Sequence, residues 1–422
     1  MKRHTIFWIA AVTAVFGLLA ASCGDDDAAD DTSAVTETAP APADEAPTAA
    51  DEEEPMAEEE PMAEEEPMAE EEPMAEEEAM ADEEPMVEEE PMEEQVDPLV
   101  ELFDANGDGV VRIGIAAQGP RDDGGYYQGL VDQAEELSAA NGFGEVIVVD
   151  EITFEEAAVE LENLANQPVD IIMVGASGLA GNLPEVAEKY PDIYWYCNCG
   201  AGFTESEFYS QTQDEGSGIH YTAGVAFGEL LKARGGDSLA IIGCCDLGFE
   251  KEMVLAIKLG MAAVDESFTV TYTPTGDFPF DFDNVANATA AFDAAVAEGA
   301  DAIYPFLGGA LEPVAQLAVD AGLIVSNPGS PRACDSEIPY DMTVRFDAGD
   351  YVRIVFTDIV AGSFPEGSVR VFTAATDPDV VGAALCDSPE LQGALDAAFA
   401  TVASGELDAA IGQIKAEAYA GG

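Results

Sequence analysis

Short apolar segments alternate with amphipathic ones along most of the chain after residue 109. Val110–Ala117 is short, apolar and rich in β-branched residues, which predicts a buried strand. In the following segment, Gly125–Ala139, the side chains of Tyr126, Leu130 and Leu137 share one helical face, and acidic and amide residues fall opposite. The globular part is therefore predicted to begin with a strand and a helix.

The same alternation continues and predicts an α/β fold with parallel sheets covered by helices on both faces. Further strands are predicted at Glu145–Val149, Ile171–Val174, Ile193–Tyr196, Leu239–Gly243, Val270–Tyr272, Ala302–Phe306 and Leu323–Ser326. Further helices are predicted at Phe154–Asn166, Asn182–Tyr190, Thr222–Ala233, Lys251–Ala263, Val285–Glu298 and Glu312–Ala321. Two groups of strands with a break near Gly216–Tyr221 indicate two lobes, about 110–218 plus 341–375 and about 222–335 plus 376–422.

The N-terminal residues 1–22 have the pattern of a secretory signal. Lys2 and Arg3 precede an apolar run from Ile6 to Leu19, and small residues then lead to Cys23. A Cys at this point is typical of a bacterial lipoprotein signal, in which the thiol is lipidated. We expect a lipid anchor at Cys23 on the extracytoplasmic face of the cell membrane; an ordinary signal peptide with a coincidental Cys is the alternative.

Residues 23–98 form an acidic linker of low complexity. Near-copies of Glu-Glu-Glu-Pro-Met-Ala run from Glu52 to Glu93, and 33 acidic and no basic residues lie between Cys23 and Pro98. Repelling carboxylates and repeated prolines predict an extended, disordered stalk with a reach of about 200 Å. Copper binding by the repeated methionines is a weaker alternative.

The strong negative charge of the chain excludes some classes of ligand and partner. The chain of 422 residues carries a formal charge of −72, of which about −41 falls in residues 99–422. Such a surface repels nucleic acid and disfavours strongly anionic ligands. We expect an uncharged small solute, no nucleic-acid partner and a monomer.

The loop after the first strand is the strongest candidate for a ligand site. Ligands bind at the carboxyl ends of parallel strands, and this loop combines Asp122 and Asp123 with Tyr126, Tyr127 and Gln128. The aromatic rings supply flat apolar faces, and the polar groups supply hydrogen bonds. The alternative is structural, with one aspartate capping the helix and the aromatics packed in the core.

Several motifs follow one another in a fixed order over residues 110–408: Gly119…Asp122-Asp123-x-x-Tyr126-x-Gln128, Asp170–Gly175, Pro184–Asp192, Tyr221–Gly224, Gly308-Gly309, Val381–Ala383 and Gly405-Glu406. Together they resemble the basic membrane protein family of ABC-transporter substrate-binding lipoproteins, which includes purine nucleoside receptors. The resemblance implies a two-lobed, type I periplasmic-binding-protein fold that closes on a nucleoside and delivers it to an ABC permease in the membrane.

By the same resemblance, Tyr126 stacks on the ligand base, and its polar neighbours in the loop bind the ligand or support the loop. The facing walls are expected to include residues at other strand ends: Gly175, Ser177, Phe306, Gly308, Gly309 and Asn327. Gly308 and Gly309 could equally form only a tight turn. The chain departs from the family pattern at Tyr127, at Ser177 and in Ser326–Ser330, and a sugar in place of the nucleoside stays open.

Six cysteines follow the signal region, as is typical of disulfides in an exported domain. Their spacing does not fit zinc, so we predict disulfides among Cys197, Cys199, Cys244, Cys245, Cys334 and Cys386, with Cys334–Cys386 one bridge. Asp104-x-Asn106-x-Asp108-Gly109 matches half of a calcium loop, but Ile115 stands where the final Glu is required, so a turn is predicted. We expect no metal and no cofactor.

Enzymatic activity is not expected. Gly175-Ala176-Ser177-Gly178 superficially resembles a nucleophile elbow, but Leu179 occupies the position of the second required glycine. His220 is the only histidine after the signal region and is predicted to be structural, near the boundary between the lobes. The alternative function of another class is a ligand sensor or interaction module on a stalk, with no permease.

Overall fold

The computed structural model describes residues 98–175, 177–200, 205–276 and 281–420, and every structural statement below concerns these residues. The predicted signal peptide, Cys23 and the acidic linker with its methionines lie outside them. In the described residues, no helix is long and apolar enough to cross a membrane.

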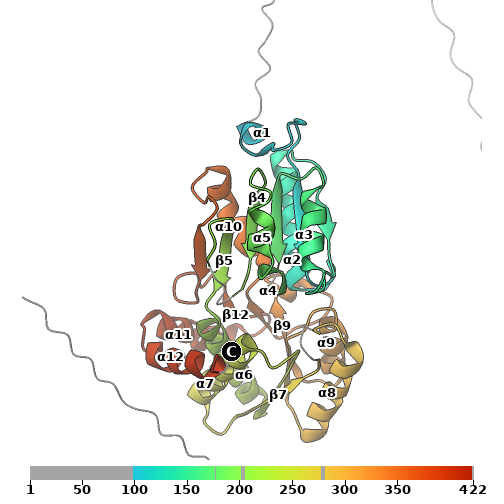
Figure 1. Cartoon of the computed structure of the whole chain (residues 1–422). Coiled ribbons are helices and arrows are strands. Elements are labelled where there is room, and N and C mark those ends of the chain that lie inside the picture. Colours follow the sequence, from blue (N-terminus) through green and yellow to red (C-terminus); the bar gives the residue numbers. More distant parts are fainter. Residues whose placement is uncertain (1–97, 176, 201–204, 277–280, 421–422) are drawn as a thin grey trace, which may run out of the picture. The chain divides into compact units, whose positions relative to one another are not determined.

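The first lobe is built on a parallel sheet with the strand order β11-β5-β4-β3-β1-β2 (Figure 1). Its strands are β1 (Ile113–Ala117), β2 (Ile147–Val149), β3 (Ile171–Gly175), β4 (Tyr194–Asn198), β5 (Ser210–Asp214) and β11 (Val369–Phe372). Its helices are α1 (Pro98–Phe103), α2 (Tyr126–Asn141), α3 (Ala157–Ala165), α4 (Ser177–Ala180), α5 (Leu183–Ala187) and α10 (Ala348–Val360). Strands β1 and β3 are buried at every position, which explains their continuous apolar pattern.

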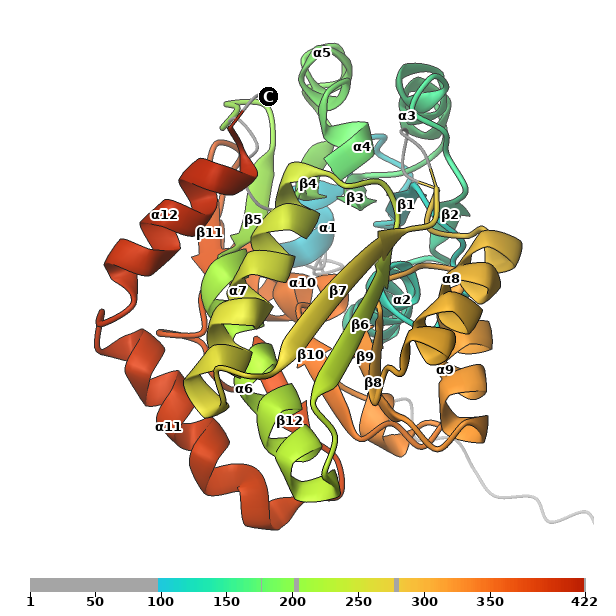
Figure 2. The same ribbon diagram turned by 90° about the horizontal axis from the view of Figure 1, so that it is seen from below.

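The second lobe contains a sheet with the order β12-β10-β9-β8-β6-β7, in which only β12 runs antiparallel to its neighbour. Its strands are β6 (Ser238–Gly243), β7 (Thr269–Pro274), β8 (Ala302–Pro305), β9 (Ile324–Gly329), β10 (Met342–Arg345) and β12 (Gly382–Leu385). Its helices are α6 (Gly216–Arg234), α7 (Gly248–Val264), α8 (Val285–Glu298), α9 (Leu311–Asp320), α11 (Gln392–Ala403) and α12 (Asp408–Ala418), with short 3-10 turns at Ala333–Asp335 and Pro389–Leu391. Figure 2 shows α6 and α7 on one face of this sheet and α8 and α9 on the other.

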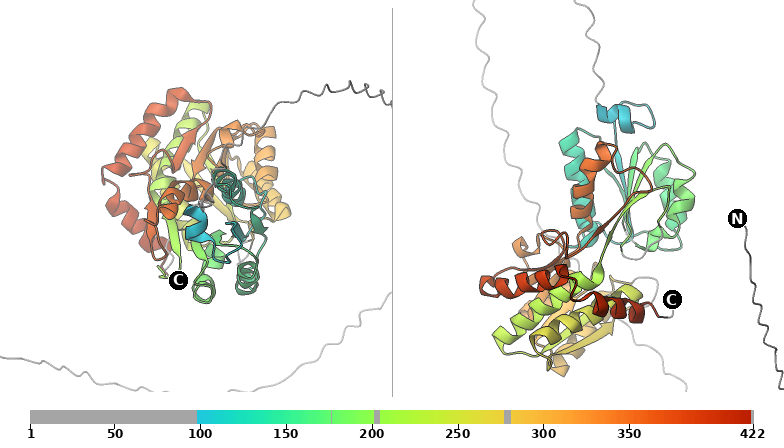
Figure 3. Two further views of the ribbon diagram at one scale, coloured as in Figure 1. Left: turned by 90° about the horizontal axis from the view of Figure 1, so that it is seen from above. Right: turned by 90° about the vertical axis from the view of Figure 1, so that its left-hand side faces the viewer.

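Helices α6 and α7 pack unusually closely. A Cβ on Gly224 would lie 2.3 Å from the carbonyl oxygen of Ile257, and a Cβ on Gly260 would lie 2.2 Å from that of Tyr221. Only glycine leaves room for this contact between two backbones. Helix α11 then packs on α6, and α12 packs on α7 (Figure 3).

The chain passes between the lobes three times, after β5, after β10 and after β11. These crossovers are bonded to one another. The backbone N–H of Glu215 donates to the carbonyl oxygen of Phe372 at 2.9 Å, which ties the first to the third. The guanidinium of Arg345, at the end of β10, donates to the carbonyl oxygens of Pro378 and Asp379 at 2.7 and 2.8 Å and so ties the second to the third. The hinge is therefore one bonded unit.

The two-lobed α/β fold expected from the sequence is confirmed, but one boundary differs. Residues 342–345 were expected in the first lobe, yet β10 pairs with β9 and β12 and so belongs to the second sheet. The break between the lobes expected near Gly216–Tyr221 lies beside the crossover after β5. Helix α6 already begins there at Gly216, because the side chain of Glu215 accepts a hydrogen bond from the backbone N–H of Gly218 at 2.6 Å.

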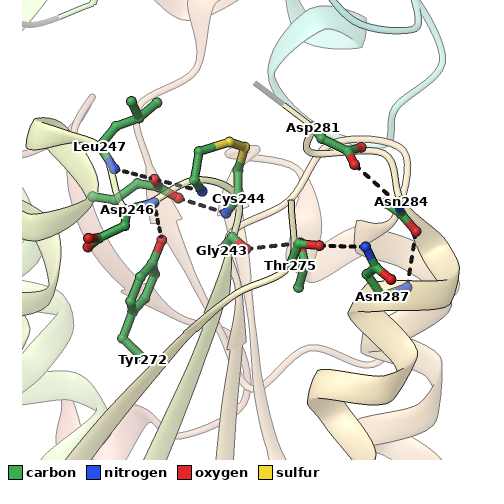
Figure 4. Close-up of a disulfide and its surroundings, with 11 residues drawn as sticks. Gly243, Cys244, Asp246, Leu247, Tyr272, Thr275, Asp281, Asn284 and Asn287 are labelled. Carbon is green, nitrogen blue, oxygen red and sulfur yellow. Dashed lines mark hydrogen bonds between the residues drawn. A yellow bond between two sulfur atoms is a disulfide. The ribbon is translucent and has the colours of Figure 1, made fainter. Parts of the chain in front are cut away.

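Three disulfides confirm the expectation for an exported domain; they join Cys197 to Cys199, Cys244 to Cys245 and Cys334 to Cys386. The Cys244–Cys245 bridge directly follows β6 (Figure 4). The loop around it is held by the hydroxyl of Tyr272, which accepts from the backbone N–H of Asp246 at 3.1 Å, and by the hydroxyl of Thr275, which donates to the carbonyl oxygen of Gly243 at 3.0 Å. The bridge is thus part of a rigid strand end.

Candidate functional site

A cavity of about 170 Å³ lies between the lobes, and its walls come from the ends of strands in both sheets. The first lobe contributes residues after β1, after β4 and at the end of β5: Gln118, Asp123, Tyr126, Tyr127, Gly200 and Asp214. The position agrees with the rule that ligands of open α/β sheets bind outside the carboxyl ends of the strands.

Tyr126 is the best-anchored aromatic ring of the first-lobe wall. Its hydroxyl donates to the side-chain oxygen of Asn198 at 2.7 Å, and its ring meets that of Tyr127 edge to face, with centroids 5.2 Å apart. Gly175 does not line the cavity. A Cβ there would lie 2.8 Å from a methyl group of Leu130 and 3.7 Å from the Tyr126 ring, so this glycine leaves space for α2 and for Tyr126.

Asp123 both lines the cavity and starts α2. Its carboxylate accepts hydrogen bonds from the backbone N–H groups of Gly125, Tyr127 and Gln128 at 2.9, 3.3 and 3.0 Å. Burial raises the pKa of the Asp123 carboxyl, and these donors oppose the shift. Much of its hydrogen-bonding capacity is therefore used by the loop itself.

The two other polar residues of this loop lie outside the cavity lining. Asp122 is exposed, and the side-chain oxygen of Gln128 accepts from the backbone N–H of Gly124 at 3.1 Å. Ser177 begins α4. Among the described side chains of the polar residues expected in this lobe, only that of Asp123 lines the cavity.

The second-lobe wall is dominated by aromatic rings around Phe306, which follows β8. The Phe306 ring centroid lies 6.2 Å from those of Phe249 and Phe282 and 5.7 Å from that of Phe346. All four line the cavity, together with Leu307. The sequence predicted only Phe306, because Phe249 lies in the first turn of α7 and Phe282 and Phe346 lie in two separate loops, and no local pattern connects them.

Gly308 lines the cavity, but the paired glycines mainly shape a turn. The backbone N–H of Gly308 donates to the carbonyl oxygen of Phe282 at 3.1 Å, and that of Gly309 donates to the carboxylate of Asp283 at 2.5 Å. Asn327 lies outside the lining and is 2% exposed, and its side-chain oxygen accepts from the backbone N–H of Ser330 at 3.0 Å. The arrangement of these residues fits the tight-turn alternative.

Two further carboxylates, neither of them predicted from the sequence, line the cavity. Asp214 ends β5, and Glu252 lies on α7. Burial raises the pKa of Asp214 to about 7, and the neighbouring carboxylates of Glu252 and Glu215 act in the same direction. The two residues belong to different lobes, so only the three-dimensional fold brings them together.

His220 lies in the same wall. Its Nδ1 is 2.9 Å from the carbonyl oxygen of Gly216, which can only accept, so Nδ1 carries the proton. Burial lowers the pKa of the imidazole to about 4, and its Nε2 is buried without a hydrogen-bond partner among the described residues. The histidine is neutral at physiological pH and presents an unused acceptor.

No metal centre is found in the part of the chain that the structure describes, since no three His, Cys, Asp or Glu side chains gather there to hold an ion. The calcium-like segment forms a turn. The carboxylate of Asp104 accepts from the backbone N–H groups of Gly107, Asp108 and Gly109 at 2.8, 3.1 and 2.9 Å.

Residues 110–377 match the family model described as ABC transporter substrate-binding protein PnrA-like, the Bmp family. The chain belongs to this family. Members bind small-molecule substrates for ABC permeases and are not enzymes, as the resemblance in the sequence implied.

Solved structures agree on the fold. An ABC transporter solute-binding protein from Conexibacter woesei is 18% identical, with a TM-score of 0.56, and the match covers 70% of this chain and 97% of that one. A second, from Aeropyrum pernix, is 12% identical, with a TM-score of 0.55, and covers 74% and 92%. A transcriptional activator of the comK gene from Bacillus halodurans is 15% identical, with a TM-score of 0.53, and covers 69% and 97%. No curated protein matches the chain.

Proposed function

We propose that this Bmp-family protein is a lipid-anchored receptor on the extracytoplasmic face of the membrane and that its interlobe cavity takes a nucleoside. The observation that carries the proposal is the pair of facing aromatic walls. Tyr126 is held by Asn198 on one side, and the cluster around Phe306 lies on the other. Flat rings on opposite lobes suit a planar base, because stacking on aromatic faces is favourable for every base.

Closure of the lobes would supply most of the binding free energy. Burial of a ring between two apolar walls removes its surface from water. The hydrogen bonds of Arg345 and Glu215 hold the three crossovers together and would keep them aligned as the lobes close. A permease would then recognise the closed form. A stalk from Cys23 to Pro98 would hold the domain within reach of the membrane.

A sugar is the second candidate. The carboxylates of Asp214 and Glu252 lie at one end of the cavity and can accept hydrogen bonds from sugar hydroxyls, while an aromatic face packs on the ring. A nucleoside has both a base and a sugar, so it uses both parts of the wall. A ring without hydroxyls would use only the aromatic part.

Native mass spectrometry of the mature protein, purified from its producing cells without refolding, tests the ligand. A retained nucleoside mass that is absent from the Tyr126→Ala variant supports the proposal. A retained hexose or pentose favours the sugar. If the protein retains nothing and millimolar nucleosides do not raise its melting temperature, the nucleoside assignment is wrong.

The anchor is tested separately, by comparing wild type with Cys23→Ser in cells fed a labelled fatty acid. Label on the wild type alone, together with loss of membrane association in the variant, supports lipidation at Cys23. Equal label on both proteins excludes that site. The control is Cys386→Ser, which removes a cysteine of the globular domain and should keep the label.

A further inference from the structure

The formally charged side chains that line the cavity, among the described residues, are all acidic. The lining includes the carboxylates of Asp123, Asp214 and Glu252, and it includes no Lys or Arg among the described residues. We infer that the solute is an organic cation with a flat ring and N–H donors. The inference rests on the proposed function only in taking this cavity as the solute site.

The carboxylate of Glu252 is buried and has no positive partner. It is 2% exposed, and its two oxygens accept from the hydroxyls of Ser217 at 2.5 Å and Tyr419 at 3.0 Å. Hydroxyl donors stabilise the ionised form but leave its charge uncancelled. A buried carboxylate in this state strongly favours a nearby cation.

Asp214 also lacks a positively charged partner among the described residues. The nearest base that acts on it, Lys415, is paired with Glu215, with 2.7 Å between the ammonium nitrogen and the carboxylate oxygen. Neither Asp214 nor Glu252 takes part in an ion pair within the described residues. Three carboxylates around one ammonium group leave a net negative charge at this end of the cavity, which a positively charged solute would neutralise.

The imidazole of His220 is an independent indication that the cavity wall contains an acceptor without a hydrogen-bond donor. It is 7% exposed, and its Nδ1 bonds back to its own helix at Gly216. The ring edge that carries Nε2 is therefore turned away from that helix, in a residue that lines the cavity, and Nε2 has no described partner. A buried acceptor of this kind costs free energy until a donor reaches it. The neutral imidazole accepts an N–H and does not compete with a cation.

The aromatic wall suits the same ligand. Phe306, Phe346 and Phe249 lie together on the second lobe, and Tyr126 lies on the first. The faces of such rings attract a cation, most strongly in a site that excludes water. A neutral ring would gain the stacking but would leave both carboxylates without counter-charge.

Matched pairs of ligands, close in shape and different in charge, test the inference by isothermal titration calorimetry at pH 7.5. One pair is 1-methyladenosine, whose purine is cationic at this pH, and adenosine. The other is tryptamine, which carries an ammonium group, and tryptophol, in which a hydroxyl replaces it. We expect the cation of at least one pair to bind at least tenfold more tightly, which corresponds to about 1.4 kcal/mol.

The variants Asp214→Asn and Glu252→Gln keep the side-chain shape and remove one charge each. Either should reduce the preference for the cation, measured as the ratio of the two affinities within a pair, at least fivefold. Glu185→Gln is the control, because it removes one charge from an exposed site on α5 outside the cavity lining. If Glu185→Gln reduces the preference for the cation as much as Asp214→Asn and Glu252→Gln do, the preference comes from the overall charge of the protein, and the inference is wrong.

The outcomes separate the two proposals. If adenosine binds as tightly as 1-methyladenosine and tryptamine gains nothing over tryptophol, the nucleoside assignment stands and the cation inference falls. If tryptamine alone binds, the cation inference stands and the nucleoside assignment falls. If no cation exceeds its neutral partner in either pair, including the case of no binding at all, the cation inference is wrong.

Discussion

The hydroxyl of Tyr126 donates to the side-chain oxygen of Asn198 at 2.7 Å and thereby links the start of α2 to the end of β4. The backbone carbonyl of Asn198 accepts from the same hydroxyl at 3.1 Å. A ring fixed at its tip loses little side-chain entropy when a solute binds against it. Positioning of the aromatic platform is thus a property of the empty protein.

Replacement of Tyr126 by Ala should weaken solute binding by about 1–3 kcal/mol, because the stacking surface is lost. Tyr126→Phe keeps the ring and loses only its tether, so its effect on affinity should be smaller. Calorimetry with the solute identified by mass spectrometry measures both. Tyr190→Ala, outside the cavity lining, is the control. Unchanged affinity in Tyr126→Ala would exclude stacking on this ring.

Replacement of Gly224 by Ala should destabilise the second lobe by about 1–3 kcal/mol, because the new methyl group would overlap the carbonyl oxygen of Ile257. Gly412→Ala on α12 is the matched control. A Cβ at that position meets nothing within 4 Å, so the variant should be neutral or slightly more stable. Urea denaturation measures both changes. Equal stability of the two variants would contradict the close packing of α6 on α7.

Removal of the Cys334–Cys386 bridge by a double substitution to Ser should destabilise the protein by up to about 4 kcal/mol. The bridge joins residues 52 apart in sequence, and cross-links that close long loops restrict the unfolded chain most. Substitution of Ser for both Cys244 and Cys245, which are adjacent in sequence, should lower the free energy of unfolding much less. Guanidinium denaturation measures both changes. A larger loss from the adjacent pair would reverse the expected order.

Asp347 should make stability fall as pH rises. It caps α10 by accepting from the backbone N–H of Asp350 at 2.9 Å, and burial raises its pKa to about 7, compared with about 3.9 in an unfolded chain. The folded state holds the proton of the Asp347 carboxyl more tightly than the unfolded chain does. Protonated Asp347 therefore contributes its full stabilisation of the fold below about pH 4, and this stabilisation is lost as pH rises through 7.

Asp347→Asn removes this titration. Between pH 4 and pH 8 the wild type should therefore lose at least about 1 kcal/mol of stability relative to the variant, since each unit of pKa shift corresponds to about 1.4 kcal/mol. Thermal unfolding at several pH values measures the difference. Asp396→Asn on the exposed face of α11 is the control and should show no such trend. A constant difference between wild type and Asp347→Asn would mean that Asp347 is not protonated in the folded protein near neutral pH.

The sequence predicted the strands whose apolar runs are continuous and missed β5, β10, β11 and β12, of which β5 is the most polar. Strand β5 contains Ser210, Gln211 and Thr212, which are buried although their pattern resembles a loop. The hydroxyl of Ser210 accepts from that of Tyr194, and those of Thr212 and Tyr196 lie 2.7 Å apart. Hydrogen bonds between neighbouring strands thus replace apolar packing, and no single segment shows this.

Only part of the candidate site could be predicted from the sequence, because some of its residues come together only in the folded chain. Tyr126 and Phe306 follow directly from the position of loops at strand ends. Asp214 and Glu252 do not, because one belongs to the unrecognised strand β5 and the other to a helix of the opposite lobe. His220 was noticed as the lone histidine of the globular part, but its unpaired Nε2 depends on burial that only the fold creates.

A crystal structure of the mature protein, purified without refolding and crystallised with its co-purified solute, tests the central claim most directly. The account predicts one solute between the lobes, with its ring in contact with Tyr126 and Phe306 and a donor group at Asp214 or Glu252. A cavity filled by the protein's own side chains, or a solute bound elsewhere while the cavity stays empty, would contradict it.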